Sequence, residues 1–263
     1  MHWRFLSDAG LDAAMNMAID EAIALSFPKK NLPTLRLYQW ACPTLTIGAF
    51  QKLDPLLLST LDKHQIAWIR RITGGKALLH DRDITYSVVA STGDALFSDG
   101  IKKTFFSIAQ GLLAGLHHLG VDATVHLPEK KPSPQTQNPF CATSISWYEM
   151  AVNEKKFIGS AQKRWRDTFL QHGSLPLVQS PIAKQCHIET LQSLVDLIPQ
   201  LPPVSKIYQA IQTGFETALG IRLEQGSLTH EEEQLAKQLA EEKYGCSTWN
   251  ENRCRLALAT TSP

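Results

Sequence analysis

Apolar positions recur at the spacing of a helix face in several segments of the chain. Asp8 is expected to cap the first of these helices. Thr229 and Glu232 form a capping box for the last helix, and Gly245 is expected to close it. We predict helices over residues 8–26, 54–63, 104–119, 182–192, 204–219 and 229–243.

Runs with alternating or β-branched residues predict strands between these helices. Residues 35–38 and 43–48 are separated by a short connection, so we expect them to pair as a hairpin. The other strands are predicted over 67–71, 85–90, 123–126, 145–152, 155–165 and 169–176. The last three follow one another too closely for crossover helices, which favours antiparallel pairing. The expected fold class is α+β, with mixed, mostly antiparallel sheets flanked by helices.

Composition is typical of one large globular domain, since the 263 residues are 43% hydrophobic and 19% charged. We expect a single domain over 1–245, with its core at about 30–225, and a C-terminal tail over 246–263. The formal net charge of +1 gives no overall field that favours nucleic acid or a membrane surface. No apolar run approaches the roughly 18–20 residues that span a bilayer, and residues 1–8 lack the features of a signal peptide.

The cysteines are odd in number and scattered, and no two form a CxxC pair. This pattern argues against a disulfide framework and against a zinc site, so no metal is expected. A reducing cytoplasm is the expected setting, and a monomer is expected because no segment indicates an obligate interface. The five cysteines are Cys42, Cys141, Cys186, Cys246 and Cys254.

Cys141 is a candidate nucleophile because Lys156 follows fifteen positions later in a segment with strand character. A nearby cation lowers the pKa of a thiol and favours the reactive thiolate. The alternative is that Cys141 is a small buried hydrophobic residue, as most free cysteines are. The residues alone leave both interpretations open.

A glycine-containing turn, Thr73-Gly74-Gly75-Lys76, follows the strand that ends at Arg70 and Arg71. Adjacent glycines allow the backbone to approach a ligand closely, and the basic residues suit a phosphate or carboxyl-like group. The spacing of a Walker A loop is absent. A tight turn with a solvated basic rim explains the same residues equally well.

Several motifs together resemble the biotin/lipoate protein ligase and octanoyltransferase superfamily, over about residues 8–245. The glycine turn fits that family's RRxTGGxAxxHxxxxTYS signature, which wraps the acyl chain and its activated carboxyl end. The other matching segments, in the family's order, are Asn16 to Ala22, Pro43 to Gln51, Lys156 to Gln162 and Gln171 to Leu175. The position of Cys141 before Ser146-Trp147-Tyr148-Glu149 is similar to the branch of transferases that use a cysteine.

The resemblance implies a site in which Cys141 and Lys156 are catalytic and no cofactor is needed. His80 and His172 are candidates for accepting the proton of an incoming amine, and Leu78, Leu79 and Trp147 for lining an acyl tunnel. The substrate-binding residues that it implies are Arg71, Thr73, Gly74, Gly75, Lys76, His80, Tyr86, Gly159, Ser160, Ala161, His172 and Gly173.

The activity that the resemblance implies is octanoyl transfer. Octanoyl-acyl carrier protein is the expected donor, and a lysine of a lipoyl domain, such as that of the glycine cleavage H protein, is the expected acceptor. Three alternatives remain open. One is an ATP-dependent lipoate-protein ligase in which Lys156 binds the adenylate and Cys141 is incidental. The others are a non-catalytic lipoyl-binding relative and an amidotransferase that moves octanoyl groups between lipoyl domains.

Overall fold

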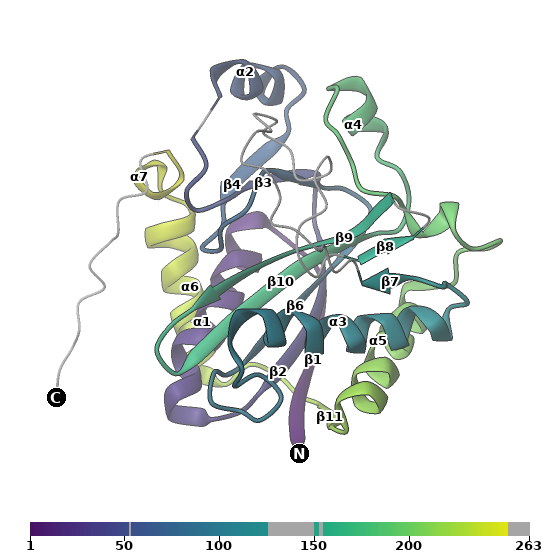
Figure 1. Ribbon diagram of the computed structural model, residues 1–263. Coiled ribbons are helices and arrows are strands. Elements are labelled where there is room, and N and C mark those ends of the chain that lie inside the picture. The colour runs from purple at the N-terminus through teal and green to yellow at the C-terminus, as the bar shows by residue number, and fades with distance from the viewer. Residues whose placement is uncertain (53, 126–149, 153–154, 252–263) are drawn as a thin grey trace, which may run out of the picture.

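The computed structural model of the protein describes residues 1–52, 54–125, 150–152 and 155–251 (Figure 1). Its described part contains an eight-stranded sheet, with helices on both faces, and a separate three-stranded sheet. Cys141, the predicted nucleophile, lies outside the described residues. So do Trp147 and the first part of the strand predicted over 145–152.

The large sheet is mixed and mostly antiparallel, as predicted. β1 pairs in parallel with β2 and with β11, and every other neighbouring pair is antiparallel. In order across the sheet, the strands are β11 (Arg222–Gln225), β1 (His2–Leu11), β2 (Thr34–Trp40), β6 (Asp83–Ser91), β10 (Thr168–Pro176), β9 (Lys155–Arg164), β8 (Met150–Val152) and β7 (Thr124–Val125).

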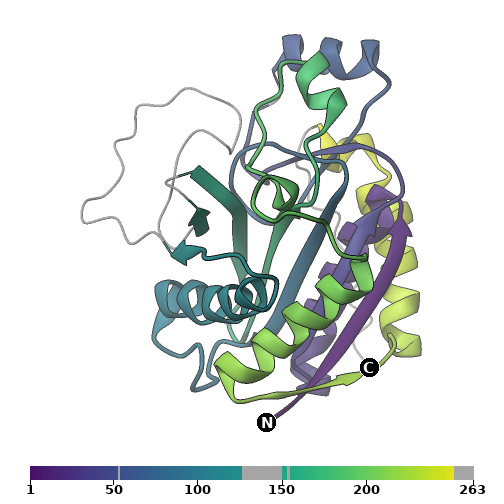
Figure 2. The same ribbon diagram turned by 90° about the vertical axis from the view of Figure 1, so that its right-hand side faces the viewer.

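Helices cover both faces of this sheet, so its central strands are buried on both sides (Figure 2). The helices α1 (Ala13–Lys30) and α6 (His230–Leu239) lie on one face, and α3 (Gly100–His118) and α5 (Val204–Leu219) on the other. Successive residues of a strand therefore enter different cores. Phe169 packs in the cluster beneath α3 and α5, whereas Leu170 packs in the cluster beneath α1.

The small sheet holds β3 (Thr44–Ile47) between β4 (Ala67–Arg70), to which it is parallel, and β5 (Leu78–His80), to which it is antiparallel. The predicted hairpin of 35–38 with 43–48 is therefore wrong. Leu35 and Leu37 of β2 enter the core of the large sheet, whereas Leu45 enters a separate core. That core is covered by the short helices α2 (Pro55–Lys63) and α4 (Pro181–Gln185).

The N-terminal segment differs most from the prediction, because β1 precedes the first helix. Asp12 caps α1, and its carboxylate accepts a hydrogen bond from the Met15 N–H at 2.8 Å. Asp8 instead stays in β1 and pairs with the Arg36 guanidinium. The helix predicted over 182–192 ends at Gln185, because His187 turns the chain with a left-handed φ of 53°.

The capping box at the start of α6 is present as predicted. The Thr229 N–H donates to the Glu232 carboxylate at 2.8 Å, and the Glu232 N–H donates to Thr229 Oγ1 at 3.3 Å. Glu232 also accepts two hydrogen bonds from the Arg4 guanidinium, at 2.6 and 2.8 Å. This ion pair attaches α6 to β1, the strand next to the edge strand β11.

The helical path continues past α6 through a π-helical turn over Ala240–Tyr244 and ends at Gly245. A one-turn helix, α7 (Ser247–Asn250), follows, and its Trp249 Nε1 donates to the Arg70 carbonyl at 2.8 Å. The expected tail over 246–263 therefore begins with residues that pack against β4.

A 3₁₀ turn over Leu194–Asp196 lies between α4 and α5. Within the described ranges, no helix is long and apolar enough to cross a membrane.

Candidate active site

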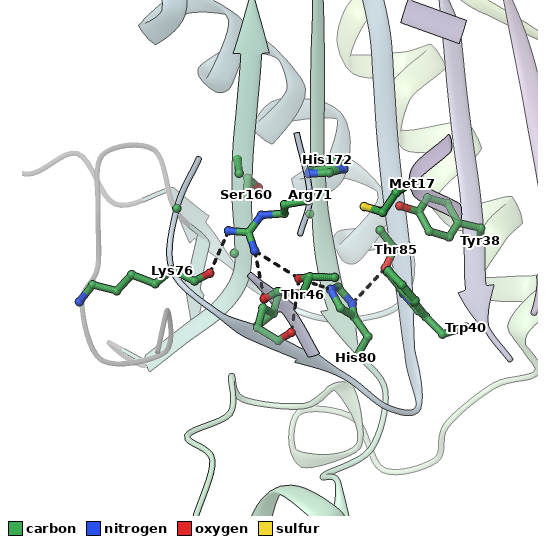
Figure 3. Close-up of a pocket in the computed structure, with 15 residues that line it drawn as sticks. Met17, Tyr38, Trp40, Thr46, Arg71, Lys76, His80, Thr85, Ser160 and His172 are labelled. Atoms are coloured by element: carbon green, nitrogen blue, oxygen red, sulfur yellow. Dashed lines mark hydrogen bonds between the residues drawn. The ribbon is translucent and has the colours of Figure 1, made fainter. Parts of the chain in front are cut away.

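A pocket opens where the large and small sheets face each other, beside the turn that follows β4 (Figure 3). The empty space within it is about 430 Å³, with the open solvent at its mouth included. The lining residues come from α1, β2, β3, β5, β6, β9, β10 and the glycine turn. They are Met17, Tyr38, Trp40, Thr46, Arg71, Gly75, Lys76, Leu78, His80, Thr85, Gly159, Ser160, Ala161, His172 and Gly173.

The Arg71 guanidinium fastens the glycine turn to β3. Its Nη2 donates to the carbonyl oxygens of Gly74 and Lys76, both at 2.8 Å. Its Nη1 donates to the carbonyl and to the hydroxyl of Thr46, both at 3.2 Å. Arg71 thus fixes the shape of the turn by hydrogen bonding to the carbonyl oxygens of Gly74 and Lys76. The Lys76 side chain extends away from Arg71 (Figure 3).

Two glycines allow the turn to lie directly on the end of β3. A Cβ atom on Gly48 would be 1.9 Å from the Gly75 carbonyl oxygen. Gly75 itself has a φ of +94°, and a Cβ there would be 2.7 Å from Arg71 Nη2. At Gly74 the nearest atom to such a Cβ would be Phe50 Cδ2, 4.0 Å away. The close approach therefore requires glycine at 48 and 75, whereas 74 has room for a methyl group.

His172 connects the glycine turn to the buried helix α1. Its Nε2 lies 2.7 Å from Thr73 Oγ1, and its Nδ1 lies 3.2 Å from Asp20 Oδ2. A carboxylate only accepts hydrogen bonds, so Nδ1 carries the proton. Burial lowers the pKa of His172, which keeps the imidazole neutral. In this tautomer Nε2 accepts the hydrogen bond of the Thr73 hydroxyl.

Asp20 is only 1% exposed and is held in its charged form by its neighbours. Burial alone would raise its pKa, but the hydrogen bond from His172 and the charge of Arg36 outweigh burial and leave the pKa below its ordinary value. Arg36 donates to Asp20 at 2.8 Å, and the hydroxyls of Tyr38 and Ser87 donate at 3.0 and 2.8 Å. The carboxylate is thus fully hydrogen bonded, and it fixes the tautomer of His172.

A second histidine, His80, lines the pocket from the end of β5 and is also fixed on both ring nitrogens. Its Nδ1 lies 2.8 Å from Asp83 Oδ2, and its Nε2 lies 3.1 Å from Thr46 Oγ1. The Trp40 indole stacks on its ring, with the centroids 4.3 Å apart and the planes 24° apart. His80 therefore has a single orientation in the pocket wall.

The wall formed by β9 and β10 brings backbone close to the pocket. A Cβ on Gly173 would lie 2.4 Å from the Gly159 carbonyl and 2.9 Å from Ser160 Oγ, so only glycine fits there. Behind this wall, Tyr86 Oη lies 2.7 Å from Ser160 Oγ and accepts a hydrogen bond from the Gln171 amide at 3.1 Å. Burial raises the pKa of Tyr86 to about 12, so the phenol stays protonated.

The structure brings together most of the site residues named from the sequence. Thr73, Gly74 and Tyr86 contact or adjoin lining residues without lining the pocket themselves. Lys156 is 5% exposed near the start of β9 and is not among the lining residues that the structure describes. The predicted residues that do line the pocket are Arg71, Gly75, Lys76, His80, Gly159, Ser160, Ala161, His172 and Gly173, together with Leu78.

Several lining residues were not named as site residues from the sequence. Met17, Thr46 and Thr85 lie within segments that carried the family resemblance, so those motifs were the available signal. Tyr38 and Trp40 lie at the end of β2, and no motif marked them. Leu79, named as a possible tunnel residue, points instead into the core of the small sheet.

The fold and this pocket define a mixed α/β domain with a candidate ligand site between its two sheets. Residues 12–215 match the model of the lipoyl protein ligase A/B catalytic domain, and the chain belongs to this family. The family resemblance predicted from the motifs is thereby confirmed.

Two curated relatives are octanoyltransferases LipM. The protein of Kyrpidia tusciae is 38% identical over 269 residues, which cover 94% of this chain and 98% of the relative. The protein of Bacillus subtilis is 31% identical over 274 residues, which cover 95% of this chain and 98% of the relative. These relatives confirm the prediction of an acyltransferase.

Two solved structures with the same fold are lipoate-protein ligases. Lipoate-protein ligase A bound with ATP superposes with a TM-score of 0.78 at 25% identity, covering 97% of this chain and all of that chain. The bi-partite lipoate protein ligase of Thermoplasma acidophilum gives a TM-score of 0.76 at 25% identity, covering 98% of this chain and all of that chain. The fold is thus common to both chemistries, whereas the relatives with higher identity favour the transferase over the ligase.

Proposed function

We propose that this protein transfers octanoate from octanoyl-acyl carrier protein, through a thioester on Cys141, to a lysine of a lipoyl domain. The observation that carries the proposal is the near full-length similarity to octanoyltransferases LipM. The pocket is consistent with it, because an apolar end beside Met17, Tyr38 and Trp40 suits the chain, and a glycine-lined end suits the carbonyl group.

The first half-reaction is thioester exchange. The Cys141 thiolate attacks the donor carbonyl, the donor's C–S bond breaks, and the carrier protein leaves as its thiolate. One thioester replaces another, so the step needs no ATP. In this proposal the charge of Lys156 stabilises the thiolate, and Lys156→Ala is expected to slow acylation. Backbone N–H groups of the glycine turn or of β9 are suited to stabilise the oxyanion.

In the second half-reaction, the lysine amine of the lipoyl domain attacks the acyl-enzyme and displaces the Cys141 thiolate. The amine must lose a proton as the amide forms. We assign the acceptance of this proton to His172 Nε2, because the imidazole lines the pocket and is neutral. The Thr73 hydroxyl, which donates to Nε2, passes its own proton to this nitrogen as it takes the proton of the amine. The Asp20 carboxylate, bonded to Nδ1, stabilises the imidazolium that results.

The setting of the reaction is also part of the proposal. We infer a monomer in a reducing cytoplasm that needs no cofactor. The carrier-protein donor and the lipoyl-domain acceptor bind at the same pocket one after the other, which predicts ping-pong kinetics.

The test is transfer without ATP. The protein is incubated with octanoyl-acyl carrier protein and a purified lipoyl domain, and the mass of the lipoyl domain is measured. The expected result is a gain of one octanoyl group on the target lysine, and none on a lipoyl domain with that lysine replaced by arginine. Modification that requires ATP and free octanoate or lipoate, with no transfer from the carrier protein, would establish the ligase instead.

A further inference from the structure

A line of polar side chains runs along β9, β10 and β6, on the face of the large sheet that α3 covers. The line begins at the half-buried Arg164, whose Nη1 donates to Gln162 Oε1 at 3.3 Å. The Gln162 amide donates to Gln171 Oε1 at 2.9 Å, and the Gln171 amide donates to Tyr86 Oη at 3.1 Å. Tyr86 Oη lies 2.7 Å from Ser160 Oγ, and Ser160 lines the active-site pocket (Figure 3). The hydrogen bonds thus connect a cation to the pocket wall.

Arg164 determines the direction of the hydrogen bonds in this line. A guanidinium only donates, so the Gln162 amide presents its oxygen to Arg164 and its NH2 group to Gln171. Gln171 is oriented in the same way, because its oxygen accepts from Gln162 and its NH2 group faces Tyr86. The orientation of both amides therefore follows from the charge at one end of the line.

Tyr86 continues the line by donating to Ser160. The phenol is 2% exposed, so water does not accept its proton. Its oxygen already accepts from the Gln171 amide, and Ser160 Oγ is the acceptor that the described residues place within reach. A buried hydroxyl without an acceptor is costly, so the Tyr86 proton lies between the two oxygens. The Ser160 hydroxyl keeps its own proton, for which the described part of the chain offers no acceptor.

Ser160 lies at the glycine-lined end of the pocket. Its chain neighbours, Gly159 and Ala161, line the pocket too, and so does Gly173, its partner in register on β10. A Cβ on Gly173 would lie 2.9 Å from Ser160 Oγ, so glycine at this position keeps the hydroxyl uncovered. The proposed function assigns the carbonyl group of the acyl chain to this end of the pocket.

We propose that Ser160 is a catalytic residue whose hydroxyl donates a hydrogen bond to the carbonyl oxygen of the acyl group, and that Tyr86 positions it. The inference rests on the proposed octanoyl transfer. As the Cys141 sulfur bonds to the carbonyl carbon, an electron pair of the C=O double bond moves to the oxygen, and the hydrogen bond strengthens. No proton is transferred in this step. When the donor's C–S bond breaks, the carbonyl re-forms and the hydrogen bond weakens again.

The line of hydrogen bonds matters because it orients the hydroxyl before the substrate binds. A serine without partners rotates freely and either donates or accepts. Tyr86 occupies a lone pair of Ser160 Oγ, which favours the donor role of this hydroxyl toward a ligand. Such a donor needs no reorientation as charge develops on the carbonyl oxygen. The positive charge of Arg164 polarises the line in the same direction.

The experiment is a double-mutant cycle on Ser160 and Tyr86, with octanoyl-acyl carrier protein as the donor. The variants are Ser160→Ala, Tyr86→Phe and the two changes combined. Ser107→Ala is the matched control, because Ser107 Oγ donates to the Leu96 carbonyl at 2.8 Å in α3, outside the pocket lining. Intact mass follows single-turnover acylation over a range of donor concentrations, and melting temperatures show whether each variant is folded.

Ser160→Ala is expected to lower the maximal acylation rate about 100-fold and Tyr86→Phe about tenfold, with little change in the half-saturating donor concentration. The double variant is expected to match Ser160→Ala, because Tyr86 acts through Ser160. Ser107→Ala is expected to keep the wild-type rate.

A folded Ser160→Ala protein with the wild-type rate overturns the catalytic role of Ser160 and leaves the proposed function intact. A wild-type rate in Tyr86→Phe, or losses that multiply in the double variant, overturns the positioning role of Tyr86. A wild-type protein that takes up no octanoyl group overturns the proposed function and this inference with it.

Discussion

Thr73 Oγ1 lies 2.7 Å from His172 Nε2, and this hydrogen bond joins the glycine turn to the central strand β10. Both side chains are buried, so water does not compete for either atom. The same imidazole reaches Asp20 through Nδ1, which extends the connection to α1. The position of the turn over the pocket thus depends on a chain of hydrogen bonds that begins in the core.

Replacing Thr73 by valine removes this hydrogen bond with little change in volume. His172 Nε2 is then a buried acceptor without a donor, which costs about 1–3 kcal/mol of unfolding free energy. Octanoyl transfer is expected to fall as well, because the turn loses its attachment to β10. Urea unfolding and the transfer rate check both effects.

Thr73→Ser is the matched control for this change, since it keeps the hydroxyl. It is expected to recover most of the stability and the activity. Losses in Thr73→Ser with none in Thr73→Val would show that the methyl group of Thr73, and not its hydrogen bond, is what matters.

The two glycines of the turn are expected to differ sharply in their tolerance of alanine. Gly75→Ala places a side chain at a φ of +94° and a Cβ 2.7 Å from Arg71 Nη2. The left-handed conformation alone costs about 1–2 kcal/mol, and the displaced guanidinium releases the turn. In Gly74→Ala the nearest atom is 4.0 Å away, so the fold should be retained.

The measurement is the melting temperature together with the transfer rate of each variant. Gly75→Ala should lower both, whereas Gly74→Ala should melt close to the wild type. Similar melting temperatures for the two variants would contradict the steric account of the turn.

Much of the fold follows from local sequence signals. The strands β6, β9 and β10 and the helix α5 are long and strongly patterned, and they were predicted nearly at their observed bounds. The capping box of Thr229 and Glu232 marked the start of α6 for the same local reason. Such signals depend only on neighbouring residues, so a single chain suffices to detect them.

The differences arise where the partner of a segment is distant in sequence. β1 is buried on both faces over Trp3 to Leu6, so it lacks the alternation that marks a strand. β5 has three residues, and β11 is a short edge strand with only Leu223 buried. In the site, the motifs named the residues of the glycine turn and of β9 and β10. Trp40 carries no motif, and it lies at the pocket beside Thr85 of β6, a strand 45 residues further along the chain.

Stability is expected to fall as the pH drops below the ordinary pKa of histidine, in part because of His172. Its pKa is lowered in the folded protein by burial, whereas in the unfolded chain it titrates near 6.5. The unfolded state therefore binds a proton that the folded state does not. The contribution of His172 to the free energy of unfolding is fully present above about pH 6.5. It is lost on acidification, by up to about 1.4 kcal/mol per pH unit.

Urea unfolding at pH 7.5 and 5.5 tests this sign. His172→Gln should lose less stability between the two pH values than the wild type. His117→Gln is the control, because the His117 side chain is 62% exposed, and it should keep the wild-type pH dependence. An unchanged pH dependence in His172→Gln would show that the pKa of His172 is the same in the folded and unfolded states, which contradicts the account.

The one-turn helix α7 is expected to stabilise the catalytic domain through Arg70. The Arg70 N–H donates to Asn250 Oδ1 at 2.9 Å, and its Nε donates to the Asn250 carbonyl at 2.8 Å. Its Nη1 donates to the carbonyls of Gly48 and Gln51 at 2.9 and 2.8 Å, beside the glycine turn. Loss of α7 therefore removes support from the pocket as well as from β4.

Two shortened proteins, one ending at Glu251 and one ending at Gly245, isolate this effect. The protein ending at Gly245 should melt at a lower temperature and transfer octanoate more slowly than the one ending at Glu251. Equal melting temperatures would place the boundary of the domain at residue 245, as expected from the sequence.

The central claim is that Cys141 carries the acyl group. The protein is incubated with octanoyl-acyl carrier protein alone, and its intact mass is measured before and after hydroxylamine. The wild type and Cys42→Ser, which removes an exposed cysteine, are expected to gain one octanoyl group that hydroxylamine releases. Cys141→Ser is expected to gain no such thioester. A hydroxylamine-sensitive octanoyl adduct that persists in Cys141→Ser would contradict the account.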